Sequence, residues 1–109
     1  MRARFEKSFN ATLFDCIDYT LTRILGRDAI ATFYYAITEQ YNIPLLEFER
    51  RPAEILQHLS ELIGVRGFEA LEESIALSVK EAFEIGADES IGLRKMIDLA
   101  KDAYLSAET

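Results

Sequence analysis

Apolar residues recur at helical spacing along this chain, in blocks that end at glycine or proline. The clearest block is residues 28–44, whose apolar positions fall within about 100° of arc on a helix: Ile30, Phe33, Tyr34, Ile37 and Tyr41. Asp28 is a suitable N-cap, and Pro44 disfavours helix at the residue before it. We therefore expect a helix that begins at about Asp28 and stops before Pro44.

Four other blocks predict helices. They begin at Ser8 or Asn10, at Pro52, at Phe68 and at Asp88 or Ser90, and the first three end at Leu25, Ile63 and Glu84, each before a glycine or close to one. The expected buried positions are Leu13, Phe14, Ile17, Leu21, Ile24 and Leu25; Ile55, Leu56, Leu59, Leu62 and Ile63; Phe68, Leu71, Ile75, Val79, Ala82 and Phe83; and Leu93, Met96, Ile97, Ala100, Ala103 and Tyr104.

The connection 42–51 is also apolar, and its Ile43, Leu45, Leu46 and Phe48 predict a short helical turn docked on the bundle. Residues 1–8 and 106–109 are expected to fray. The pattern thus predicts an all-α protein in which residues 1–109 form a single compact bundle of about five helices with short connections.

The composition indicates in which part of the cell the protein is expected. The 109 residues hold one cysteine and no apolar run near the roughly 18 residues of a membrane span. The first ten residues lack the apolar core of a secretory signal. We therefore expect a cytoplasmic protein with no membrane association.

The net charge of −7 is unevenly distributed. Residues 1–51 carry seven Lys/Arg and seven Asp/Glu, whereas residues 52–109 carry five against twelve. Phosphate-backbone binding normally needs a basic footprint, so the charge pattern argues against nucleic acid as the principal ligand.

Residues capable of chemistry are few. One histidine, His58, and one cysteine, Cys16, leave too few ligands for a metal site, and no phosphate-binding glycine motif is present. A Cys16–His58 pair is conceivable, but each residue flanks an apolar stripe and a structural role is favoured. The sequence therefore predicts no catalytic, cofactor-binding or metal-binding residues, and a protein that is not an enzyme.

Surface residues suggest contact with a partner instead. Tyr19 and Tyr35 are expected to face outward, and Leu77 is expected opposite the core, ringed by Glu73, Glu81 and Glu84, with Glu69 on the same acidic face. Tyrosine is favoured at interfaces, so these seven residues form the candidate interaction surface. The alternative is that they are unrelated surface residues.

The order of these features resembles the small archaeal helical modules of the Nitrosopumilus output domain family. The likeness spans about residues 12–86 and is carried by Ile17, Asp18, Leu21, Gly26, Phe33, Tyr34, Tyr35, Tyr41, Ile43, Phe48, Pro52, Leu56, Leu59, Ile63 and Gly64. The resemblance implies an archaeal cytoplasmic helical domain that acts by contact, as an output or adaptor part of a signalling system. It supplies no active-site residues.

Together these observations predict a non-enzymatic protein-interaction module without a cofactor, whose partner is a basic protein. Two alternatives stay open. One is a homodimer formed through the Tyr19 surface or the helix at 68–84. The other is a bundle that binds an apolar small molecule between rings such as Phe33, Tyr34, Phe48, Phe68 and Phe83.

Overall fold

The computed structural model describes residues 8–88 and 91–108. Its helices are α1 (Phe9–Leu25), α2 (Arg27–Tyr41), the 3₁₀ helix η1 (Leu45–Arg50), α3 (Pro52–Ile63), α4 (Val65–Ala82) and α5 (Leu93–Glu108). The described ranges contain no strand, and the prediction of an all-α bundle is confirmed. None of the helices described is both long and apolar enough to cross a bilayer.

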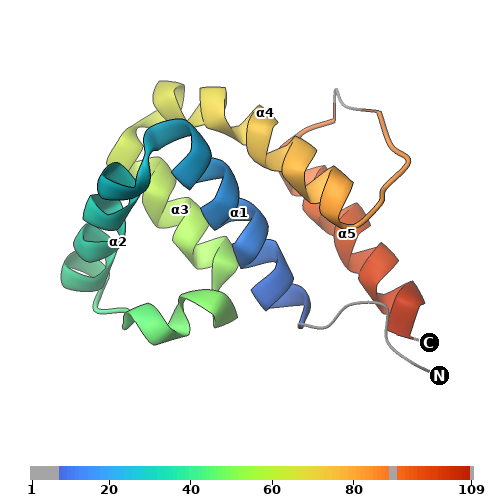
Figure 1. Cartoon of the computed structure of the whole chain (residues 1–109), viewed down its shortest axis with the longest axis horizontal. Coiled ribbons are helices and arrows are strands. Elements are labelled where there is room, and N and C mark those ends of the chain that lie inside the picture. The colour runs from blue at the N-terminus through green and yellow to red at the C-terminus, as the bar shows by residue number, and fades with distance from the viewer. Residues whose placement is uncertain (1–7, 89–90, 109) are drawn as a thin grey trace.

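Helix α1 lies at the centre of the bundle and α4 runs across its upper end (Figure 1). α1 packs against α4, α2, η1 and α3, whereas α5 packs chiefly against α4. The core they share contains apolar side chains from every helix, and it follows the predicted stripes at most positions. Two predicted core residues are exposed instead: Ile24, which is 42% exposed, and Ala82. Both lie in the last turn of a helix, where fewer neighbouring elements cover the side chains.

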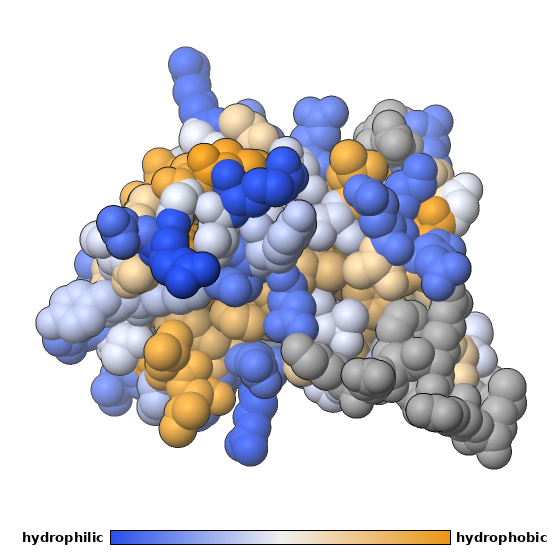
Figure 2. Space-filling view, in the orientation of Figure 1, coloured by the Kyte–Doolittle hydropathy of each residue, from blue (hydrophilic) through white to orange (hydrophobic). Residues whose placement is uncertain are grey.

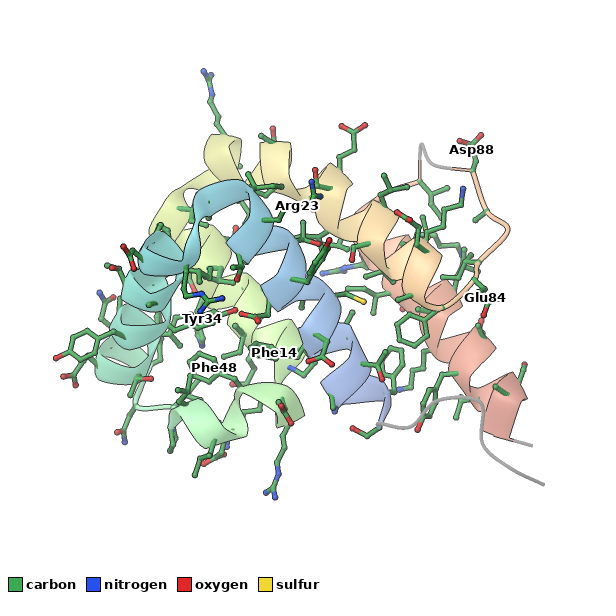
Figure 3. The ribbon with its side chains drawn as sticks, viewed as in Figure 1. Phe14, Arg23, Tyr34, Phe48, Glu84 and Asp88 are labelled. Atoms are coloured by element: carbon green, nitrogen blue, oxygen red, sulfur yellow. The ribbon has the colours of Figure 1, made fainter. Side chains whose placement is uncertain are left out.

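Two buried side chains anchor the segment between α2 and α3: Ile43, which is 3% exposed, and Phe48. Phe48 is fully buried, and its ring lies edge-on to the rings of Tyr34, at 5.3 Å, and Phe14, at 6.2 Å (Figure 3). The expectation that Leu45 and Leu46 also dock is wrong, since they are 60% and 92% exposed, and Figure 2 shows apolar side chains at the surface over the start of η1. A 3₁₀ helix of six residues makes two turns and buries one side, which Phe48 occupies.

Two corners of the fold are single glycines with almost the same backbone. Gly26 joins α1 to α2 with φ 95° and ψ 156°, and Gly64 joins α3 to α4 with φ 96° and ψ 149°. Each glycine N–H donates to the carbonyl four residues earlier, and each glycine carbonyl accepts from the N–H four residues later. Each corner therefore ends one helix and starts the next without an intervening loop. Residues with a side chain rarely adopt a backbone of positive φ, which explains why glycine occupies both corners.

Helix α4 differs from its predicted bounds at both ends. It begins at Val65 instead of Phe68, because Gly64 is the only residue between α3 and α4, and Gly67 is part of the helix. A Cβ on Gly67 would lie 3.0 Å from Ile63 Cγ2, so its lack of a side chain lets α3 and α4 approach closely. At the other end Glu84, with φ 52°, takes the left-handed position at which glycine was expected. The N–H groups of Ile85 and Glu84 donate to the carbonyls of Lys80 and Glu81, which is a Schellman motif.

The predictions for the two ends of the chain and for the start of α5 can be checked where the structure describes these residues. Ser8 caps α1 by accepting a hydrogen bond from the Ala11 N–H at 3.2 Å, so this residue is ordered at the helix start. Helix α5 begins at Leu93, too late for Asp88 to cap it, and it continues through residues 106–108 where fraying was expected. Residues 1–7, Ser90 and Thr109 lie outside the described residues.

Candidate functional site

Two hollows on the surface meet at Leu77 of α4. The larger, of about 530 Å³, lies between α1 and α4 and is lined by Tyr19 and Arg23 on one side and by Leu77 and Glu81 on the other. The smaller, of about 160 Å³, lies between α4 and α5 and includes Glu73 and Met96. Leu77 and Ser74 line both hollows. We call this continuous surface the Leu77 surface.

The α1 side of the Leu77 surface carries an exposed aromatic ring. Tyr19 is 65% exposed, and the guanidinium carbon of Arg23 lies 6.0 Å from the centre of its ring. A cation–π contact at an exposed site contributes about 0.5–1 kcal/mol, enough to bias the ring toward Arg23 without burying it. Figure 3 shows Arg23 extending from the upper part of α1. Tyr19 is therefore a partly oriented ring with most of its area available for contact.

The α4 side carries charge around an apolar centre. Glu73 and Glu81 lie one helical turn before and after Leu77, and both are exposed. Among the described residues that line the hollows, Arg23 and Lys80 are the cations. Exposed Glu69 adds a further carboxylate on α4, two turns before Leu77, whereas Glu84 lies beyond the end of this helix.

The structure brings together four of the seven predicted surface residues: Tyr19, Glu73, Leu77 and Glu81. Leu77 does not face away from the other helices as expected. It is 40% exposed, because α1 and α5 rise on either side of it. Glu84 does not complete the ring around Leu77, since α4 ends at Ala82 and the backbone turns at Glu84.

The remaining two residues lie elsewhere. Tyr35 is 67% exposed on α2, and its hydroxyl donates to Glu39 Oε1 at 2.9 Å. This hydrogen bond to a carboxylate raises the pKa of Tyr35. Glu69 is exposed two turns before Leu77 and lines neither hollow. Tyr35 and Glu69 thus remain surface residues outside the Leu77 surface.

Sequence reasoning did not single out Arg23, Ser74, Ser78 or Met96, which also line the hollows. One local signal was available, because Ser74 and Ser78 are small side chains spaced one turn apart on either side of Leu77. Small residues at such spacing leave space beside a larger neighbour. The contribution of Met96 depends on how α5 crosses α4, which no local pattern specifies.

Cys16 and His58 have different neighbours. The Cys16 thiol lies 3.9 Å from the Ser78 carbonyl, and burial raises its pKa, which disfavours the reactive thiolate. The His58 ring stacks on Tyr41 at 3.6 Å, and its Nδ1 lies 3.2 Å from Glu61 Oε1. Across residues 8–88 and 91–108, no three His, Cys, Asp or Glu side chains converge as metal ligands would.

A third hollow, of about 590 Å³, lies between α3 and α5 over α4, and we call it the α3–α5 groove. Of the rings expected to line a ligand pocket, Phe68 borders this groove. Phe48 and Phe83 are fully buried, and Phe83 packs 5.4 Å from Phe9. These two rings fill the core instead of bordering a space.

Comparison of the chain with protein-family models, with curated proteins and with solved structures gives no match. The site is therefore interpreted from its own geometry.

Proposed function

We propose that this protein is a non-enzymatic interaction module that binds a basic protein through the Leu77 surface. The observation that carries the proposal is the convergence of an exposed tyrosine and an exposed leucine, from helices α1 and α4, on one hollow with carboxylates at its edge. In line with the family resemblance, the module would serve as the output or adaptor part of an archaeal signalling system in the cytoplasm.

The shape of the surface favours a protein over a small molecule. Small-molecule sites bury most of the ligand in a concave pocket, whereas Tyr19 and Leu77 remain 65% and 40% exposed beside open hollows. Tyrosine rings and partly buried leucines are typical centres of protein interfaces, where a partner completes their burial. An apolar side chain of the partner would occupy the hollow between Tyr19 and Leu77.

The two carboxylates beside Leu77 favour a partner with basic side chains. Glu73 and Glu81 flank Leu77 by one turn on each side, so cations one turn before and after the partner's apolar anchor would face them. Exposed Glu69, two turns before Leu77, adds to the negative charge of α4. At the rim of an interface such charges act mainly on association rate and on the choice of partner.

The proposal is tested with a synthetic amphipathic helix that carries one leucine stripe flanked by lysines. It is titrated into isotopically labelled protein and followed by amide chemical shifts. We expect the largest shifts at Tyr19, Leu77 and Glu81, and weaker binding as salt concentration rises. The variant Glu73→Lys with Glu81→Lys should lower the affinity at least tenfold and mainly through a slower association rate.

A matched control reverses two charges elsewhere, Glu49→Lys with Asp102→Lys, which changes the net charge by the same amount. Both residues are exposed, on η1 and α5. If the control weakens binding as much as the Glu73/Glu81 variant, the attraction is nonspecific and the Leu77 surface is not the site. Shifts that map to other helices would contradict the proposal directly.

A further inference from the structure

The α3–α5 groove lies between two helices that make little contact with each other. α3 and α5 both pack against α4 but make few contacts with one another, and Figure 1 shows them standing apart beneath α4. Phe68 forms part of the floor, and Leu56 and Leu93 line the walls. All three side chains are at most 8% exposed, so the apolar residues beneath the groove are already closely packed.

The rim of the groove on α5 carries two opposite charges around an apolar side chain. Arg94, Ile97 and Asp98 all line the groove and lie on one face of α5. Arg94 and Asp98 are exposed and one turn apart, yet they form no ion pair with each other or with another described residue. Ile97, between them, is partly buried.

This arrangement complements itself across a two-fold axis. Residues 94 and 98 lie equally far, about 3 Å along the helix, from the level of Met96. An antiparallel copy of α5 related by an axis at that level places Arg94 opposite Asp98 of the second copy, and Asp98 opposite Arg94. The two Ile97 side chains then lie about 3 Å apart along the helix direction, within contact across the axis.

We propose that a second copy of this chain docks on the α3–α5 groove, forming a two-fold dimer in which two Arg94–Asp98 ion pairs flank an Ile97–Ile97 contact. Such an interface is isologous, so it closes at two copies and does not propagate into a filament. It lies on a different pair of helices from the Tyr19 side of the Leu77 surface, and so it stands independently of the proposed function.

The size of the groove sets the strength of the dimer. Stable interfaces use about 20–30 residues on each side, whereas ten residues line this groove. The net charge of −7 on each copy adds repulsion, which is largely screened beyond about 8 Å at physiological ionic strength. The dimer is therefore a weak one that forms at high protein concentration.

The test measures mass by sedimentation from about 10 μM to about 1 mM, the range that brackets weak association. We expect the mass to rise with concentration from 12.4 kDa toward twice that value. Arg94→Asp alone and Asp98→Arg alone each bring like charges together across the axis, and each variant should remain a monomer. An equimolar mixture of the two variants restores opposite charges and should dimerise at least as well as the wild type.

Charge substitutions one residue after Arg94 and one turn after Asp98 serve as controls. Lys95→Asp and Asp102→Arg change exposed charges on α5 that do not line the groove, so dimerisation should persist. A wild type that stays at 12.4 kDa over the whole range would overturn the proposal. So would a dimer that survives both single groove substitutions, or a mixture that remains monomeric; circular dichroism of each variant confirms that its helices are intact.

Discussion

Phe48 is expected to be the residue on which the region between α2 and α3 depends. Its side chain is fully buried and contacts rings from α1 and α2, so it ties η1 to both helices. Replacing a buried phenylalanine by alanine removes apolar burial and leaves a cavity, at a cost of about 3–5 kcal/mol. That cost includes the loss of the two edge-on ring contacts, at about 0.5–1.5 kcal/mol each.

A domain of this length has a free energy of unfolding of about 5–16 kcal/mol. Phe48→Ala should therefore remove a large fraction of it and lower the midpoint of thermal unfolding by about 15–25 °C. The measurement is helical circular dichroism during thermal and urea unfolding, with the free energy taken from the urea series.

Leu46→Ala is the matched control, because Leu46 is in the same 3₁₀ helix and is 92% exposed. A surface substitution of this kind should change the free energy of unfolding by no more than about 0.5 kcal/mol. The reasoning is refuted if Phe48→Ala costs less than about 1 kcal/mol. It is also refuted if the two variants lose equal stability, because burial would then not determine the cost.

Three further predictions use the same unfolding measurements. Gly64→Ala should cost about 1–3 kcal/mol, because φ 96° strains any side chain, while Gly86→Ala, where a Cβ meets nothing within 4 Å, should be near neutral; equal costs would contradict this. Glu84→Gly removes left-handed strain but loses the interactions of Glu84 and adds the freedom of glycine when unfolded, so it should change stability by less than about 1 kcal/mol; a loss above about 2 kcal/mol would contradict this. Tyr34→Phe should cost about 1 kcal/mol near pH 7, since the Tyr34 hydroxyl donates to Asp18 at 2.7 Å. Burial, and then this bond, raise the pKa of Tyr34, so its stabilisation is complete below about pH 10 and declines as pH rises further; a difference between wild type and variant that grows above pH 10 would refute the assignment.

The helices and most of the core could be predicted from local pattern, because apolar spacing determines which face of a helix is buried. The segment 42–51 shows the limit of such reasoning. Its four apolar residues predict docking, but a short 3₁₀ helix buries one side, and the pattern cannot distinguish Phe48 from Leu46. Similarly, the Schellman motif gives Glu84 the left-handed position although a glycine, Gly86, follows two residues later, since the exact end of α4 depends on hydrogen bonds that the sequence does not display.

The candidate site was predictable residue by residue but not as an assembly. Tyr19 and Leu77 could each be identified as outward-facing apolar side chains. Their meeting in one hollow depends on α1 and α4 packing directly against each other. The α3–α5 groove is harder to predict, because it results from the separation of two helices that both pack on a third. That separation depends on the crossing angles of the helices and not on the periodicity of any one helix.

The single-glycine corners at Gly26 and Gly64 have a consequence for how this chain can be altered. One extra residue in a helix-to-helix joint without slack rotates the following helix by about 100° and advances it by about 1.5 Å. An insertion at either corner would thus turn the apolar stripe of α2 or α4 toward water. By contrast, ten residues, 83–92, separate α4 from α5, and they include the exposed Gly86, so this connection is not a single-residue joint. Tags, reporter domains or permuted termini should therefore be accommodated near Gly86 and rejected at the two corners.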